Sequence, residues 1–301
     1  MNHVIAVPLD QNLAEFIGKK GSVNGITFFD RKSGDDVIVA LMPSSVEEKP
    51  YGMAEALLLG EEVVLSTALV DKSFGETLVA CSLLGKHVLL TNDNDVSNLL
   101  SGGVLKDYEI VGRDVLLDRI LSFKTRQDSS PVRIDIDKAF PVHGVGTVAL
   151  GFVTSGVVKT HDQLCHPSGK RPVVRSIQSQ DVDVKEAGVG TRVGLALKGI
   201  EHDEMEKGDI LCAAPVPKAR GAKVKLTVSG IAGERLQESV QYQFVSNFAH
   251  ANARLKEDGE AHLVSFEKPI SVCNGDGFFL IRSQKPRIFA FGTVSATMPN
   301  L

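Results

Sequence analysis

Residues 18–22, Gly-Lys-Lys-Gly-Ser, combine the groups that a phosphate site uses. Glycine amides can cradle phosphate oxygens, a lysine supplies charge and a serine hydroxyl can bind magnesium. The segment, however, follows a stretch with helical spacing instead of preceding one, and a phosphate binds at the amino end of a helix. A C-terminal helix cap at Gly18 is therefore the better interpretation of these residues.

Other candidate chemistry is sparse. His161 and His166 flank a possible metal half-site, but a closed site needs about four ligands and no second cluster has suitable spacing. The acidic pairs 35–36 and 61–62 fit solvated turns, and the sequence contains no GxSxG or HExxH motif. The cysteines stand singly, without a CxxC pair, and we expect small apolar side chains rather than a redox or zinc centre. They are Cys81, Cys165, Cys212 and Cys273.

Composition describes an ordinary globular chain. Of 301 residues, 43% are hydrophobic and 23% are charged, and the formal net charge is -4. No apolar run is long enough to span a bilayer, and residues 1–3 lack the basic character of a signal peptide. We therefore expect a cytoplasmic location with no membrane partner. Because the net charge gives no general attraction to phosphate backbones, we expect no DNA partner, and any RNA contact would need a local basic patch.

Residues 1–124 alternate short β-type runs with helical patterns, which is typical of an α/β domain around a mainly parallel sheet. The predicted strands cover residues 4–9, 25–29, 36–42, 62–66 and 87–91. Helical spacing falls between them and ends near glycines at positions 18, 60 and 85. A polar stretch that ends at Pro131 then predicts a linker.

Beyond this linker the sequence reads as short alternating strands with recurring glycines, a pattern that favours β-barrels. A proline-containing stretch at residues 213–221 divides the region, so we predict barrel domains at 131–214 and 221–301. In the second of these, strands are expected at residues 223–228, 240–246, 249–255, 260–266, 278–281 and 287–295.

Residues 143–158, HGVGTVALGFVTSGVV, contain a G-x-GTV-x-x-G-x-x-x-x-G pattern. This pattern, together with residues 174–178, 187–200 and 207–211, resembles domain two of translational GTPases of the elongation factor Tu and selenocysteine-factor type. Residues 285–294 are similar to the last strands of domain three. The resemblance implies a P-loop-GTPase-like α/β domain followed by two all-β barrel domains.

Family members hold their nucleotide with a phosphate loop, an Asp-x-x-Gly motif and an Asn/Thr-Lys-x-Asp motif. Here the first predicted strand runs directly into Asp10, Gln11 and Asn12, and residues 43–48 contain neither the aspartate nor the glycine. The resemblance therefore implies a vestigial nucleotide site without hydrolysis, because phosphoryl transfer depends on these groups. No cofactor is therefore expected, and GTP with magnesium would bind only if this altered site has kept its affinity for nucleotide. Its residues are Asp10, Gln11, Asn12, Thr91, Asn92, Asp93 and Asp95, with Asn92 in place of the lysine.

In the same family, domain two lines the pocket for the aminoacylated tRNA end, and the matching positions here are Gln178 and Arg192. The leading hypothesis is a non-hydrolysing relative of the elongation factors that binds tRNA, the ribosome or another translation factor. A GTPase with an unconventional site and a regulatory protein-binding scaffold are the alternatives.

Overall fold

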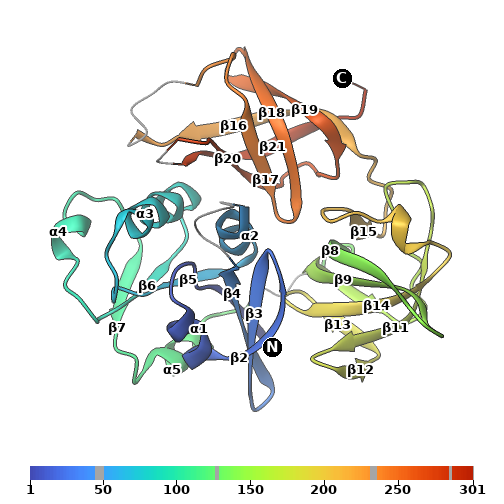
Figure 1. The fold of residues 1–301 in the computed structure, drawn as a ribbon, viewed down its shortest axis with the longest axis horizontal. Helices are drawn as coiled ribbons and strands as arrows, with labels where there is room; N and C mark the ends of the chain where they lie inside the picture. Colours follow the sequence, from blue (N-terminus) through green and yellow to red (C-terminus); the bar gives the residue numbers. More distant parts are fainter. Residues whose placement is uncertain (45–50, 126–128, 231–235, 285–286, 301) are drawn as a thin grey trace.

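The computed structural model describes residues 1–44, 51–125, 129–230, 236–284 and 287–300. An α/β domain forms the N-terminal part, and two β-rich domains follow it (Figure 1). This is the fold class that the sequence predicts. Within the described ranges no helix is long and apolar enough to cross a membrane.

The N-terminal sheet has seven strands in the order β2-β3-β4-β1-β5-β6-β7. The strands β4, β1, β5, β6 and β7 are parallel, whereas β2 and β3 are antiparallel additions. The bounds are β1 Asn2–Ala6, β2 Lys19–Asn24, β3 Ile26–Ser33, β4 Asp36–Pro43, β5 Glu62–Leu65, β6 Val88–Thr91 and β7 Tyr108–Val111.

Two strands of this sheet are absent from the sequence prediction. Strand β2 was missed because its sequence, KKGSVN, is polar and lacks a period of two. Strand β7 was missed because it has only four residues. Both lie at the ends of the sheet, where one-sided pairing weakens the sequence pattern.

The described part of this domain contains five helices, of which α2, α3 and α4 connect parallel strands, and the short α4 and α5 were not predicted. They are α1 Gln11–Ile17, α2 Tyr51–Leu59, α3 Lys72–Leu84, α4 Ser97–Leu100 and α5 Leu116–Leu121. Gly18 caps α1, since its N–H donates to the carbonyl of Ala14. The chain then continues at once as β2, and a Cβ atom at Gly18 would lie 2.8 Å from the backbone of Phe29. A glycine at this position therefore allows the backbone of β3 to approach closely.

The middle domain contains a six-stranded antiparallel sheet, β12-β11-β14-β9-β8-β15, and the pair β10-β13. Gly156 turns the chain between β9 and β10 with φ 65°, and a Cβ atom there would lie 2.4 Å from the carbonyl oxygen of Ser130. The bounds are β8 Arg133–Val142, β9 Gly146–Ser155, β10 Val157–Lys159, β11 Val173–Ser179, β12 Val182–Val184, β13 Glu186–Gly188, β14 Arg192–Lys198, the 3-10 helix His202–Glu204 and β15 Ile210–Cys212.

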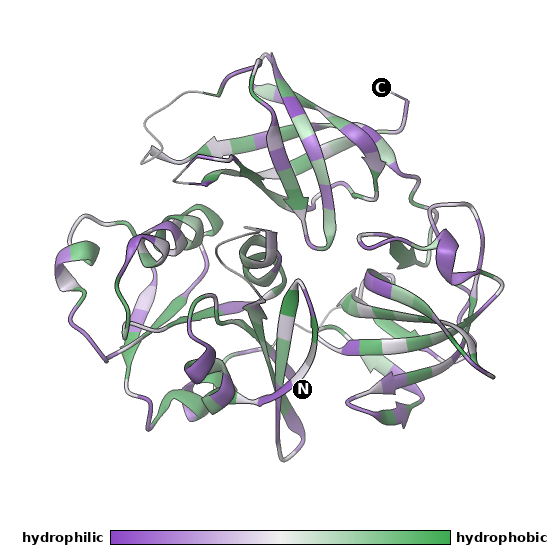
Figure 2. Cartoon of the chain, viewed as in Figure 1, coloured by the Kyte–Doolittle hydropathy of each residue, from purple (hydrophilic) through white to green (hydrophobic). Residues whose placement is uncertain are grey.

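The C-terminal domain is a closed barrel in the order β16-β19-β18-β17-β20-β21. Buried residues alternate with more exposed ones along β18, and Figure 2 shows the matching alternation of hydrophobic and hydrophilic residues in this strand. All six predicted strands are present. Their bounds are β16 Ala219–Val228, β17 Tyr242–Ser246, β18 Ala249–Asp258, β19 Ala261–Ile270, β20 Gly277–Ile281 and β21 Ile288–Met298.

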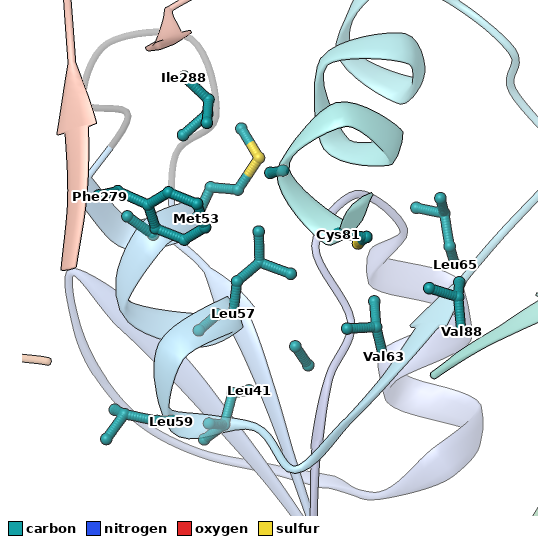
Figure 3. Packing of buried hydrophobic residues seen from close by; sticks show 14 of the residues in the cluster. Leu41, Met53, Leu57, Leu59, Val63, Leu65, Cys81, Val88, Phe279 and Ile288 are labelled. Atoms are coloured by element: carbon teal, nitrogen blue, oxygen red, sulfur yellow. The ribbon is translucent and has the colours of Figure 1, made fainter. Parts of the chain in front are cut away.

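Helix α2 is buried on nearly every side, because it lies between the N-terminal sheet and the barrel. Met53 and Leu57 of α2 belong to the same hydrophobic cluster as Phe279 and Ile288 of the barrel (Figure 3). One continuous core therefore joins two domains, and separating them would expose the apolar surface of α2 to water.

Candidate functional site

The loop after β1 places Asp10 at the amino end of α1. Its Oδ1 accepts a hydrogen bond from the N–H of Leu13 at 3.0 Å, and the side chains of Gln11 and Asn12 are exposed on the first turn. Only residues 7–10 separate the strand from the helix. The helix amides that could bind a phosphate are thus already satisfied in part by a carboxylate of the chain itself.

The loop after β6 is held by a buried threonine pair. The N–H of Thr67 donates to Oγ1 of Thr91 at 2.8 Å, and Oγ1 of Thr67 donates to the carbonyl of Thr91 at 2.8 Å. Oγ1 of Thr91 in turn donates to Oδ2 of Asp93 at 2.5 Å. These bonds fix the position of Asp93 at the carboxyl edge of the sheet, where β1, β5, β6 and β7 end.

Asp95 has a different role. Its Oδ1 accepts hydrogen bonds from the hydroxyl and the N–H of Ser97, and these bonds lower the pKa of the Asp95 carboxyl. The carboxylate therefore bonds to the first residue of helix α4. Asn92 is exposed in the same loop, without the long cationic side chain that the family motif places there.

Arg113, just after β7, connects the two halves of the predicted nucleotide site. Its guanidinium lies 3.8 Å from Oδ2 of Asp10 and 3.3 Å from Oδ1 of Asp93. The structure thus brings Asp10 and Asp93 together around a cation of the chain. The sequence prediction did not include Arg113, and recognition of β7 would have been the signal for it.

Residues 45–50, which cover most of the segment that replaces the Asp-x-x-Gly motif, lie outside the described residues, as do residues 285–286 of the domain-three resemblance. Among the residues that are described, no group of three or more His, Cys, Asp or Glu could hold a metal ion. His166 of the suspected half-site contacts Asp209 at 3.1 Å instead, and both side chains are buried.

The two predicted partner residues meet at a second place, a cavity of about 350 Å³ between the N-terminal and middle domains. Gln178 lines it and donates to Oδ1 of Asp183 at 2.9 Å. Arg192 lies over the ring of Phe28 at 3.7 Å from the centroid. Burial raises the pKa of Asp30 in the same cavity, and the charge of Arg192 opposes that rise. The cavity therefore offers both a carboxyl and a guanidinium.

A third polar group, the three-domain junction, joins all domains through Glu55 of α2. One carboxylate oxygen of Glu55 lies 2.7 Å from Nζ of Lys207 in the middle domain and 2.7 Å from Nε2 of His250 in the barrel. Lys207 also lies 3.7 Å from Asp137, which accepts a hydrogen bond from Asn24 at 2.8 Å. Burial raises the pKa of Asp137, while the charges of Lys207 and Arg192 lower it. No local sequence pattern could have revealed these long-range contacts.

Comparison with known proteins agrees with this architecture. The sequence model of the family described as Elongation factor Tu domain 2 matches residues 146–212. An uncharacterized protein of Methanocaldococcus jannaschii is 30% identical over 297 residues, which cover 94% of this chain and 96% of that protein. The selenocysteine-specific elongation factor of the same organism is 27% identical over 237 residues. Together these matches place the chain in a translational GTPase-like family.

Coverage within the family is uneven. The chain spans 48% of that selenocysteine-specific factor and 39% of the elongation factor 1-alpha of Metallosphaera sedula. The solved structure of elongation factor SelB from Methanococcus maripaludis with the GTP analogue GppNHp matches 100% of this chain with a TM-score of 0.81, at 17% identity. At this identity the similarity shows a shared fold.

Proposed function

We propose that this chain is a non-hydrolysing member of its family that binds a translation component without using GTP. The observation that supports this most directly is Arg113, held between Asp10 and Asp93 at the edge where the family's nucleotide site lies. A triphosphate placed there would lie against the two carboxylates, and these already share the positive charge of Arg113. Asp10 also occupies an amide of α1 that a phosphate would need.

The buried position of α2 supports the same proposal. In a timed switch, the segments that sense the terminal phosphate must rearrange when it is lost. Here Glu55 lies against Lys207 of one β domain and His250 of the other, and the apolar residues of α2 are shared with the barrel core. Such a helix is suited to a fixed arrangement of the three domains.

For the partner, we propose tRNA, the ribosome or another translation factor, encountered in the cytoplasm. The relatives are named as elongation factors, and the cavity with Gln178 and Arg192 lies between the N-terminal and middle domains. Its combination of amide, carboxyl and guanidinium groups suits a polar ligand with several hydrogen-bonding groups, such as the aminoacylated end of a tRNA.

Titration with a fluorescent GTP analogue, with and without magnesium, tests the nucleotide part of the proposal. The expected result is no saturable change in fluorescence and no release of phosphate. Magnesium-dependent saturation with turnover would instead establish a GTPase with an unconventional site.

Pull-down of the full chain from native lysate tests the partner part. Retention of tRNA or ribosomal RNA above the level of an Arg192→Ala, Gln178→Ala double variant supports the proposal. Retention of protein alone, unchanged in the double variant, would favour a regulatory scaffold.

A further inference from the structure

The turn at residues 166–169, with the sequence His-Pro-Ser-Gly, lies in the loop between β10 and β11. Proline at its second position and glycine at its fourth favour a type I turn. The N–H of Gly169 donates to the carbonyl of His166 at 2.9 Å, and the N–H of His166 donates to the carbonyl of Lys170 at 2.9 Å. The turn thereby brings the side chains of Ser168 and His166 into contact.

Three side chains at this turn form a hydrogen-bonded line. Oγ of Ser168 lies 2.8 Å from Nδ1 of His166, and Nε2 of the same ring lies 3.1 Å from Oδ2 of Asp209. Only 1% of the His166 side chain and 2% of the Asp209 side chain are exposed, whereas Ser168 is exposed. A serine hydroxyl beside an imidazole that a buried carboxylate orients is the arrangement that activates serine as a nucleophile.

The neighbours of the His166 ring determine which nitrogen carries the proton. Nε2 faces a carboxylate, which can only accept, so Nε2 carries the hydrogen. The backbone N–H of Ser168 donates to Nδ1 at 3.2 Å, and an N–H can only donate. Nδ1 therefore presents its lone pair to the turn and can take the proton of the Ser168 hydroxyl. Serine proteases use the two nitrogens in the opposite sense, but either nitrogen of a neutral imidazole can accept a proton.

Asp209 is held by three further groups, and these keep the imidazole in one orientation. Oδ2 accepts a hydrogen bond from the N–H of Glu206 at 2.9 Å. Oδ1 lies 2.8 Å from Nζ of Lys218 and 3.3 Å from the hydroxyl of Ser271. Burial alone would raise the pKa of Asp209, but hydrogen bonds from His166 and Lys218 lower it, so the carboxylate stays ionised.

The hydroxyl of Ser168 is accessible to a small molecule. Ser168, Gly169 and Lys170 are all exposed, and a Cβ atom at Gly169 would meet no atom of the described residues within 4 Å beyond its chain neighbours. The backbone N–H of Lys170 is directed at Oγ of Ser168 at 3.5 Å. A donor at this place stabilises the negative charge that develops on an acyl group under attack. Because an exposed turn offers few contacts, the acyl donor must itself be small and reactive.

We propose that Ser168 accepts an acyl group from small activated esters, with His166 as the base. Oγ of Ser168 forms a bond to the carbonyl carbon of the ester, and Nδ1 of His166 takes the hydroxyl proton. The bond between the carbonyl carbon and the leaving oxygen then breaks, and the leaving group departs as an alcohol or its anion. The products are an acyl ester of Ser168 and the released alcohol. This activity goes beyond the proposed function and is independent of GTP and of the cavity that contains Arg192.

The probe is p-nitrophenyl acetate, added to the full chain, with peptide mass spectrometry to locate the acetyl groups. The expected result is an acetyl group on Ser168 that hydroxylamine removes, because hydroxylamine cleaves esters and leaves acetylated lysine intact. Ser101 is an internal reference in the same sample, since it is exposed and its hydroxyl donates to the carbonyl of Asn98 at 2.7 Å. Ser168 should be acetylated about a hundredfold faster than Ser101.

His166→Asn removes the base, so acetylation of Ser168 should slow about a hundredfold. Ser101→Ala is the matched control and should leave the rate at Ser168 unchanged. Circular dichroism establishes that both variants fold, and the comparison of Ser168 with Ser101 in the unmodified chain needs no variant. The proposal is overturned if Ser168 is acetylated no faster than Ser101 or if the acetyl groups lie on lysines alone. An unchanged rate at Ser168 in folded His166→Asn would also overturn it.

Discussion

The carboxyl edge of the N-terminal sheet and the three-domain junction both set carboxylates against a cation, but in different surroundings. At the edge, the side chains of Arg113, Asp93 and Asp10 are 37%, 27% and 17% exposed, and the ion pairs are longer than 3 Å. At the junction, the Glu55 side chain is 1% exposed and lies 2.7 Å from Lys207. Water screens all three side chains of the first group, whereas in the second it reaches Lys207 and His250 but hardly reaches Glu55. The chain thus uses a buried carboxylate to join domains.

The junction should dominate stability, and Glu55→Gln tests this most severely. Loss of the buried carboxylate leaves Lys207 and His250 without their shared partner, so unfolding should become easier by about 3 kcal/mol. Urea denaturation followed by circular dichroism measures the change.

Glu186→Gln is the matched control, because Glu186 and Lys159 form a pair in which both side chains are 61% exposed. The substitution should lower the free energy of unfolding by about 0.5 kcal/mol or less. Equal losses in the two variants would mean that the buried junction is no stronger than a surface pair.

Glu76→Gln probes the other contact between the N-terminal domain and the barrel. The carboxylate of Glu76 in α3 accepts hydrogen bonds from the backbone N–H groups of Arg287 and Ile288. Loss of its charge should lower the free energy of unfolding by about 2 kcal/mol, since hydrogen bonds to charged groups are stronger than those between neutral groups. It should also loosen the barrel from α3, which small-angle scattering would detect as a larger radius of gyration. An unchanged radius and stability would place the whole interdomain coupling at Glu55.

Acid should weaken the contact between the middle domain and the barrel through Asp209. Burial alone would raise the pKa of Asp209, but hydrogen bonds from His166 and Lys218 outweigh it, so the folded pKa lies below 3.8. A lowered folded pKa means that the group stabilises the fold above the unfolded pKa, and that this contribution is lost as pH falls through the folded value. Thermal denaturation between pH 5 and about 2.5 should therefore be steeper for the unmodified chain than for Asp209→Asn. Parallel profiles would show that other carboxyl groups control acid unfolding.

Sequence reasoning was most successful where a pattern is local. Short strand-like runs predicted every strand of the barrel, and the glycine pattern at residues 143–158 led to the family. It was least successful where a feature depends on tertiary contacts. The pairing of β2 with β3, the turn that presents Arg113, and the meeting of Glu55 with Lys207 all depend on residues far apart in the chain. Gln178 and Arg192 line one cavity, and their role in binding a partner stays a prediction.

Arg113→Ala carries the smallest expected effect and bears most directly on the carboxyl edge. Because its ion pairs are partly exposed, its loss should cost about 0.5 kcal/mol in urea denaturation. Affinity for a fluorescent GTP analogue should not appear, since Asp10 and Asp93 would then face a phosphate without any compensating cation. If the variant instead bound the analogue saturably with magnesium, Arg113 would be an occluding side chain over a latent nucleotide site. The exposed carboxyl edge would then be as functional as the buried three-domain junction. The two regions would differ in how accessible they are and not in the kinds of charged groups that they contain.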